Sequence, residues 1–473
     1  MSAPLVLAVV GHTNAGKTSL LRTLTRRVDF GEVSDRPGTT RHSEAIALRA
    51  DGQVLARFID TPGLEDSVAL LEFLQRQPGQ TRLARVRAFL AGPEAQACFE
   101  QEAKVLRALV DGADCALLVI DAREPVLPKY RAEIEILSWC GRPVMPLLNF
   151  LREAGGHAQH WHAALQECGL HARAEFDVVA PLDGSEQQLY TDLATLLPAQ
   201  RAQLHALAQA LARGARERER AALRTLADTL VDVAAMRRSV SAADFADAAE
   251  RAAVVRRFQD EVRAHARRAV AALLALHAFR PGDAELAELP ELSGRWEDDL
   301  FNPVLLRQAG SQLGLGAAIG AGLGMAADLA LAGLSLGAAT TLGATLGGAA
   351  SGGWKPVWRK LENRWQGVQE MSVEDPVLLL LARQLLRLAR ALAQRGHGAV
   401  QVLQLADEDA GEPLSGAREL LRLLAPARAH ARWERGAGAG GAQGEQREHT
   451  VRAVAQWLQR QQGPDAPLVP APP

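Results

Sequence analysis

The chain contains 473 residues, with 53 Lys and Arg against 55 Asp and Glu, so its formal net charge is −2. This balance gives no overall basic field, and we expect no nucleic-acid partner. Its four cysteines, at 98, 115, 140 and 168, show no paired spacing, which excludes a disulfide or zinc framework and indicates a reducing, cytoplasmic location. Because a predicted strand begins at residue 5, we expect no signal peptide.

The first predicted elements are a strand over residues 5–10 and a helix that begins near Ser19, joined by a glycine-rich loop. The loop fits G-x-x-x-x-G-K-[ST], in which backbone N–H groups surround the phosphates of a nucleotide. Lysine is rare in this chain, at five of 53 basic residues, yet Lys17 stands where an ammonium group must reach the β- and γ-phosphates. The predicted nucleotide-binding residues of the loop are Gly11, Asn14, Ala15, Gly16, Lys17, Thr18 and Ser19.

A second motif follows at the distance that a nucleotide switch requires. Residues 43–49 and 54–60 form a predicted hairpin, and its second strand ends in D-x-x-G at Asp60 to Gly63. In this motif the carboxylate holds Mg²⁺ through water and the glycine N–H senses the γ-phosphate.

A polar, turn-rich loop at 34–41 lies between the two motifs. Its Thr40 hydroxyl is predicted to complete the Mg²⁺ shell, with Thr18 and Asp60, only when a γ-phosphate is bound. The order strand–loop–helix–loop–hairpin predicts an α/β, P-loop NTPase domain with a mixed, mostly parallel sheet.

These motifs resemble the Era/TrmE-like branch of bacterial GTPases. The resemblance rests on Gly-x-x-Asn-Ala-Gly-Lys at 11–17, Pro-Gly-Thr-Thr-Arg at 37–41 and Asp-Thr-Pro-Gly at 60–63, and it covers about residues 1–200. It implies a G domain that binds and hydrolyses GTP with Mg²⁺.

The resemblance also implies catalytic roles, which fall on Asn14, Lys17, Thr40 and Gly63. Asn14, with the loop at 32–38, stands where this branch holds K⁺ beside the phosphates, a charge that an arginine finger otherwise provides. Leu64 replaces the glutamine by which Ras-like proteins orient water. Either Glu65 or Asp66 takes over that task, or both are ordinary solvated carboxylates.

The segment that reads the base departs from the family pattern. The family uses Asn-Lys-x-Asp after a strand, whereas this chain has Asn149-Phe150-Leu151-Arg152 after the predicted strand at 144–148. Asn149 is a predicted nucleotide-binding residue, but Arg152 replaces the carboxylate that accepts two protons from guanine, a contact worth about 2–3 kcal/mol of discrimination. Glu153 is an alternative acceptor. GTP is the first expectation, and an ATP-dependent or relaxed-specificity switch is the alternative.

The stretch between Asp60 and Asn149 spans 89 residues, about thirty more than a minimal switch domain needs. The excess lies at about 66–105, directly after the loop that senses the γ-phosphate, and has amphipathic helical spacing. We interpret it as an insertion that is either a lid or partner surface that moves with the nucleotide, or a passive surface elaboration.

After residue 185 strand signals fade. We expect long helices over 201–300, with a cap at Ser239-Val240-Ser241 before a helix at 242–249. A helical C-terminal domain is expected over 301–462, with a disordered Pro-rich tail at 463–473. Its predicted helices cover 377–394, 414–433 and 447–461.

The segment 308–353 differs from the rest, with thirteen glycines and Asp328 as its one charged residue. Glycines four residues apart favour close helix packing, so we predict a Gly/Ala-rich helical hairpin. The stretches 308–327 and 329–353 are each long enough to cross a bilayer, but Gly and Ala add little transfer energy. The hairpin is therefore either buried within the domain or inserted in a membrane.

Taken together, the sequence predicts a GTP-hydrolysing switch that controls a C-terminal helical effector domain. The alternative is a membrane-associated scaffold or anchor regulated by nucleotide. The expected partners are GTP and GDP, a protein not identified by the sequence, a second copy in a nucleotide-dependent dimer, and a membrane through 308–353. The expected location is the cytoplasm, in the membrane case at the inner face of the cell membrane.

Overall fold

The computed structural model divides into two compact units, residues 1–217 with 394–401 and residues 218–393 with 402–473. It describes residues 3–26, 44–50, 53–151, 157–178, 181, 184–241, 243, 246–279, 300–301, 334–335, 368–396, 415–436 and 442–461.

Unit 1 is built on a six-stranded sheet in the order β2-β3-β1-β4-β5-β6. Its strands are β1 (Leu5–Val10), β2 (Glu44–Ala50), β3 (Gln53–Asp60), β4 (Cys115–Asp121), β5 (Val144–Asn149) and β6 (Ala174–Glu175). Only β2 runs antiparallel to its neighbour, because it is joined to β3 by a short hairpin. The predicted mixed, mostly parallel sheet is confirmed.

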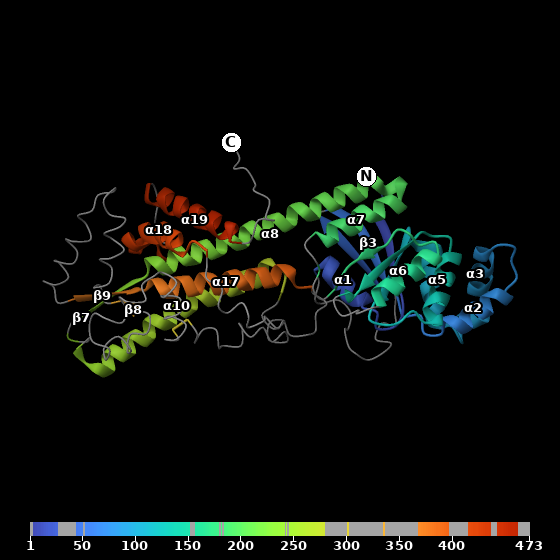
Figure 1. The fold of residues 1–473 in the computed structure, drawn as a ribbon, viewed down its shortest axis with the longest axis horizontal. Coiled ribbons are helices and arrows are strands. Elements are labelled where there is room, and N and C mark those ends of the chain that lie inside the picture. Colours follow the sequence, from blue (N-terminus) through green and yellow to red (C-terminus); the bar gives the residue numbers. More distant parts are fainter. Residues whose placement is uncertain are drawn as a thin grey trace. The chain divides into compact units, whose positions relative to one another are not determined.

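Helices cover both faces of this sheet (Figure 1). The described helices of residues 1–217 are α1 (Lys17–Thr25), α2 (Ser67–Arg76), α3 (Arg82–Ala91), α4 (Glu100–Arg107), α5 (Pro128–Trp139), α6 (His157–Glu167), α7 (Ser185–Leu196) and the start of α8 (Arg201–Ala235). Short helical turns lie at Pro93–Gln96, Ala108–Gly112 and Pro198–Gln200.

Successive side chains of a strand point to opposite faces of the sheet, and each face packs against a different set of helices. Leu7 and Val9 of β1 belong to one core cluster with α1, α7 and the start of α8, whereas Ala8 and Val10 belong to another with α2 to α6. Both faces are buried, as expected for parallel strands with continuous apolar sequence. All four cysteines are free.

The segment predicted as an insertion at about 66–105 is helical and lies between β3 and β4. We call residues 67–112, from the start of α2 to the end of the last turn before β4, the helical insertion. The Asp66 side chain caps α2 by accepting a hydrogen bond from the Ala69 amide, and the Thr81 hydroxyl caps α3 in the same way through Ala84. Gly92 ends α3 before a 3₁₀ turn and α4. Inside, the rings of Phe73, Phe89 and Phe99 lie with centroids 5.6–6.1 Å apart.

Unit 2 is mainly helical, as predicted. Its elements are the rest of α8, β7 (Arg237–Ser241), α10 (Ala248–Leu276), β8 (Leu334–Ser335), β9 (Val368–Val373), α17 (Asp375–Gln394), α18 (Ala417–Ala429), a 3₁₀ turn (Ala431–Gly436) and α19 (Ala442–Arg460). One core cluster draws on all four long helices and α18.

Two details of unit 2 correct the sequence expectations. The segment Ser239–Ser241, predicted as a helix cap, lies in β7, which pairs with β9 in a small antiparallel sheet ordered β7-β9-β8. Within the predicted helix at 242–249, residues 243 and 246 are helical. The long helix α10 then begins after Asp247, which accepts hydrogen bonds from the Ala249 and Glu250 amides at 2.8 and 2.9 Å. The strand went unpredicted because its sequence, RRSVS, has little apolar alternation.

Most of the predicted hairpin at 308–353 lies outside the described residues, as does the tail at 463–473. Leu334 and Ser335 are described, and they form β8, which pairs with Val373 and Ser372 of β9. The prediction of a continuous helix over 329–353 is therefore wrong at Leu334 and Ser335, which lie in a strand. Among the described helices, none has the length and apolarity needed to span a membrane.

Candidate functional site

The loop between β1 and α1 has the backbone geometry of a phosphate cradle. Gly11 and Gly16 have φ of 139° and 94°, and Asn14 also has a positive φ, of 66°. A Cβ on Gly11 would lie 2.3 Å from the Val119 carbonyl oxygen, so only glycine fits there. The loop leads into the N-terminus of α1, where amide groups and the helix dipole favour an anion.

Lys17 lies inside this loop, with a relative exposure of 7%. Its Nζ donates hydrogen bonds to the Gly11 and His12 carbonyl oxygens, at 3.1 and 2.9 Å. Burial lowers the pKa of Lys17 to about 8, against opposing effects from Asp60 and Glu133. The ammonium is thus placed within the cradle, held by groups that a phosphate can replace.

The predicted magnesium ligands Thr18 and Asp60 are brought together. The Thr18 Oγ1 donates to Asp60 Oδ2 at 3.0 Å, and Asp60, at the end of β3, is 1% exposed. A hydroxyl and a carboxylate oxygen beside a phosphate cradle are the hard donors that Mg²⁺ prefers, so this pair fits the ion. Thr40, the third predicted ligand, lies outside the described residues.

The D-x-x-G loop packs directly on the phosphate loop. A Cβ on Gly63 would lie 2.3 Å from Thr13 Oγ1 and 2.7 Å from the Thr13 amide nitrogen. The next residue, Leu64, forms a bridge with His12, and its amide donates to the Gly11 carbonyl at 3.4 Å. The predicted γ-phosphate sensor is therefore next to the predicted phosphate site.

The two carboxylates after Gly63 differ in their surroundings. Asp66 is engaged as the cap of α2, at 3.1 Å from the Ala69 amide. Glu65 is exposed. Asp66 is exposed as well, so which of the two helps to place the attacking water stays a prediction.

The Asn149 side chain forms hydrogen bonds with the backbone of three separate segments. Its side chain is fully buried; Nδ2 donates to the Ala15 carbonyl at 3.0 Å, and Oδ1 accepts from the Phe150 and Val178 amides at 2.9 and 3.1 Å. These contacts join the phosphate loop to the ends of β5 and the following strand. Sequence reasoning assigned Asn149 to the nucleotide, and its contacts give it a positioning role around that site.

Phe150, which stands in place of the family lysine, is covered by an arginine. The Arg123 guanidinium carbon lies 4.0 Å from the ring centroid, and Arg123 also pairs with Asp121 at 2.8 Å. Phe150 has φ of 59°, a strained conformation for an aromatic residue. Arg152 and Glu153 lie outside the described residues, so the guanine-reading prediction for Glu153 stays a prediction.

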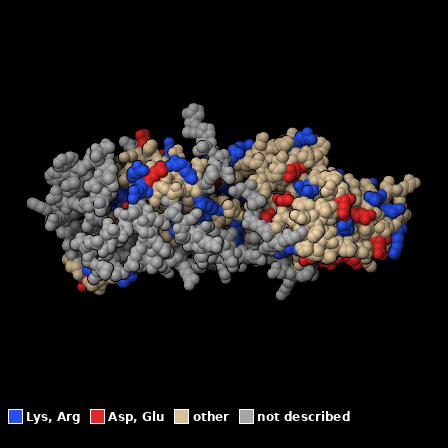
Figure 2. Space-filling view, in the orientation of Figure 1, with Lys and Arg blue, Asp and Glu red and all other residues tan. Residues whose placement is uncertain are grey.

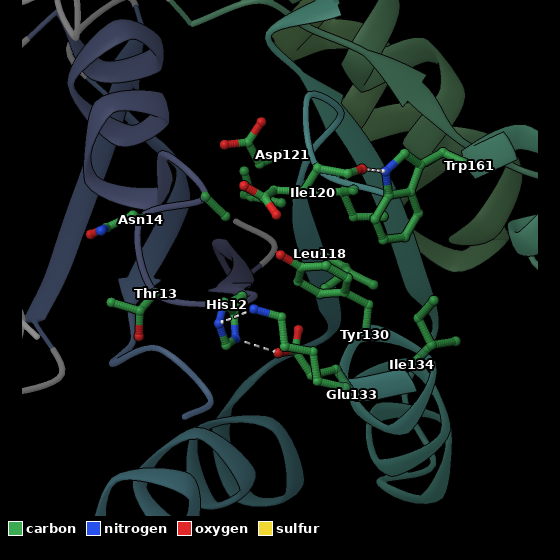
Figure 3. A pocket seen from close by; sticks show the side chains of 14 residues that line it. His12, Thr13, Asn14, Leu118, Ile120, Asp121, Tyr130, Glu133, Ile134 and Trp161 are labelled. Atoms are coloured by element: carbon green, nitrogen blue, oxygen red, sulfur yellow. Dashed lines mark hydrogen bonds and ion pairs between the residues drawn. The ribbon is translucent and has the colours of Figure 1, made fainter. Parts of the chain in front are cut away.

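A polar cluster that the sequence did not predict joins the phosphate loop to α5 through His12 and Glu133 (Figure 3). His12 Nδ1 is 2.8 Å from Glu133 Oε1, and Lys129 Nζ is 3.0 Å from His12 Nε2. Glu133 is 2% exposed, and burial raises its pKa while the hydrogen bond from His12 lowers it. Lys129 and Glu133 stand four residues apart on α5, a spacing that signals a shared helix face.

This cluster forms part of the wall of a cavity of about 240 Å³. The wall also includes Asn14, Asp121, Tyr130 and Trp161, so it joins the phosphate loop to the carboxyl end of β4. In Figure 3 the Asn14 side chain points away from the His12 cluster. Asn14 is exposed, and its amide oxygen is a donor suited to K⁺; the loop at 32–38 lies outside the described residues.

The surface of unit 1 carries both signs of charge. On the face visible in Figure 2, Lys and Arg side chains are interspersed with Asp and Glu over its described residues. This distribution agrees with the near-zero net charge of the chain.

Family models match both parts of the chain. The model of the 50S ribosome-binding GTPase family matches residues 6–150, and the model of DUF3482, a domain of unknown function, matches residues 162–456. GTPase Der from Azorhizobium caulinodans is 29% identical over 197 residues, which cover 41% of this chain and 36% of Der. The tRNA modification GTPase MnmE from Granulibacter bethesdensis is 44% identical over 68 residues, 14% of this chain and 15% of MnmE.

Solved structures also match part of the chain. A variant of Era from Aquifex aeolicus, bound to GDP and AlF₄⁻, shares 19% identity over 40% of this chain and 56% of Era, with a TM-score of 0.30. The match to each of the two sequence relatives spans well under half of that relative's length. Because its C-terminal model covers more than half of the residues, the chain belongs to the DUF3482 family, and its residues 6–150 form a GTPase domain.

Proposed function

We propose that this protein is a molecular switch that binds GTP and hydrolyses it to GDP and phosphate, and that the nucleotide state controls the C-terminal helical domain. One observation carries the proposal: Lys17, Thr18 and Asp60 converge within the glycine cradle at the N-terminus of α1. Such a set is suited to phosphoryl transfer, in which catalysis is mainly positioning and charge stabilisation.

Each of these residues has a defined task in the proposed reaction. The Lys17 ammonium exchanges its two carbonyl partners for phosphate oxygens and stabilises the charge that develops as the γ-phosphate leaves. Thr18 and Asp60, with Thr40 proposed as a third ligand, would hold Mg²⁺, which neutralises charge on the β- and γ-phosphates when it is bound. The Gly63 amide reports the presence of the γ-phosphate to the loop that follows.

A charge beside the phosphates is proposed to come from K⁺. Asn14 and residues 32–38 would hold this ion, since Asn14 is exposed on the phosphate loop.

Relaxed base specificity is a second candidate function, favoured by the substitution of Arg152 for the guanine-reading carboxylate and by the engagement of Asn149 with protein groups. In that case the protein would hardly distinguish guanine from adenine.

Equilibrium binding of GDP and ADP, with Mg²⁺ and KCl present, tests the proposed base. We expect GDP to bind about a hundredfold more tightly than ADP, a difference of about 2.7 kcal/mol. Because Arg152 replaces the guanine-reading carboxylate, this preference would come from backbone contacts, Asn149 or Glu153. Comparable affinities would replace the GTPase proposal with a relaxed-specificity or ATP-driven switch.

Membrane association through 308–353 is a separate proposal that rests on the sequence of that segment. Protein that resists carbonate extraction from membranes would support insertion, whereas full extraction would support a hairpin buried in its own domain.

A further inference from the structure

The helical insertion contacts the loop after D-x-x-G through one buried carboxylate. Glu102, on α4, is 5% exposed, and its Oε1 accepts hydrogen bonds from the amides of Glu65 and Asp66, both at 3.2 Å. Hydrogen bonds from backbone amides to a carboxylate are charge-assisted and stronger than those to a neutral acceptor. Because one oxygen accepts two consecutive amides, it fixes the direction of this stretch of backbone.

Other elements hold the same loop at its two ends. At the start, Leu64 is bound to the phosphate loop through the Gly11 carbonyl, and at the end the Ser67 hydroxyl donates to the Lys129 carbonyl of α5 at 2.7 Å. The middle of the loop is held by Glu102. Every step from the phosphate cradle to the insertion is thus a direct contact within unit 1.

The position of Glu102 is itself set by packing. Its neighbours Ala103, Val105 and Leu106 are fully buried in the cluster that also contains residues of α2 and α3. Close-packed interiors transmit displacement, so a movement of α2 or α3 would reach the carboxylate and the loop it holds.

We propose that Glu102 is a positioning residue for nucleotide hydrolysis: it holds the loop that follows Gly63 in the conformation used for the reaction. This inference rests on the proposed GTPase function and deepens it, because it makes the helical insertion a working part of the switch. Glu102 itself touches neither nucleotide nor attacking water; it acts through the backbone of Glu65 and Asp66.

Two substitutions at this position separate the role of the acceptor from that of the charge. Glu102→Leu removes the acceptor, and we expect kcat for GTP to fall about tenfold with KM changed less than about twofold, because misplacing a loop costs rate while the phosphate contacts remain. Glu102→Gln keeps an acceptor oxygen without the charge, and we expect a loss of about two- to threefold. Glu100→Gln, an exposed carboxylate on the same helix, is the matched control and should leave kcat unchanged.

Hydrogen exchange supplies a readout that does not depend on turnover. In the segment 63–70, amide exchange should be fastest in Glu102→Leu, intermediate in Glu102→Gln, and unchanged in Glu100→Gln. GDP affinity equal to that of the wild type verifies that each variant is folded. If Glu102→Leu does not fold, the comparison of Glu102→Gln with Glu100→Gln decides, and equal kcat and equal exchange in these two would overturn the inference.

The two proposals fail in different ways. A wild-type protein that does not hydrolyse GTP contradicts the proposed function. Hydrolysis by the wild type together with an undiminished kcat in folded Glu102→Leu contradicts only the role of Glu102. A kcat reduced equally by Gln and Leu would also overturn it, since the retained acceptor oxygen would then have no effect.

Discussion

Lys17 has a side-chain charge that depends on pH within the working range, because burial lowers its pKa to about 8. Phosphate binding favours the ammonium form, so above pH 8 binding must take up a proton. We expect GDP affinity to be flat near pH 7 and to fall by up to about tenfold per pH unit above pH 8. Titrations between pH 7 and 9.5 measure this, with Lys17→Ala as a weak and pH-independent control; constant wild-type affinity up to pH 9.5 would contradict it.

Substitution of Glu133 provides a second test of the pKa of Lys17. Its carboxylate raises the pKa of Lys17, so Glu133→Gln should move the midpoint of the affinity curve to lower pH. Glu135→Gln, two residues along α5, is the matched control and should leave the midpoint in place. A midpoint that shifts upward, or does not move in Glu133→Gln, would show that the two groups are not coupled.

Asn14 is the residue at which the potassium proposal is tested. Replacement of KCl by NaCl at equal ionic strength should lower GTP turnover severalfold or more, since the smaller, more strongly hydrated ion does not fill the same site. Asn14→Ala should turn over slowly in both salts. Equal wild-type rates in KCl and NaCl would remove K⁺ from the mechanism.

Several of these residue roles follow from sequence, and others do not. The phosphate loop and Asp60 were predictable because their spacing is fixed by the ligand they surround. Glu102 and the His12–Glu133 pair were not, because their partners lie 36 to 121 residues away along the chain. Asn149 was predicted as a nucleotide residue, but only the structure shows that its side chain also joins three segments of backbone.

At the scale of elements, charged side chains join helices of unit 2. Arg447 of α19 pairs with Asp228 and Asp232 of α8 at 2.9 and 2.8 Å, and only 14% of its side chain is exposed. Burial raises the pKa of Asp232, and the hydrogen bond from Arg447 opposes this rise. Removal of the guanidinium would leave two carboxylates close together without this partner.

We therefore expect Arg447→Met to lower the free energy of unfolding of unit 2 by about 3 kcal/mol, the size typical of breaking a largely buried pair. Arg452→Met is the matched control on the same helix: its side chain is 69% exposed and its pair with Glu448 should contribute at most about 1 kcal/mol. Chemical denaturation of the variants, followed by circular dichroism, measures both. Equal losses in the two would contradict a special role for Arg447.

The sequence predicted helices whose apolar residues recur with a helical period, but it did not predict the short strands of unit 2. The helix expected at 377–394 is found as α17, Asp375–Gln394, because its apolar positions recur on one face. The strands β7 and β9 were missed, since their pairing joins Arg237–Ser241 to Val368–Val373 across more than a hundred residues. Local sequence does not encode such pairing.

At the scale of the whole molecule, the chain joins a GTPase domain to a mainly helical DUF3482 region. The structure places the helical insertion directly behind the loop that follows Gly63, within the first unit. In the proposed switch, nucleotide hydrolysis at Lys17 and Asp60 would drive the state of the whole protein.

Steady-state phosphate release from GTP and from ATP, in Mg²⁺ and KCl, tests that claim most directly. We predict that the wild-type protein releases phosphate from GTP with a kcat/KM at least about a hundredfold higher than from ATP, and that Lys17→Ala abolishes the release. No release from either nucleotide, or release that Lys17→Ala leaves unchanged, would contradict the account.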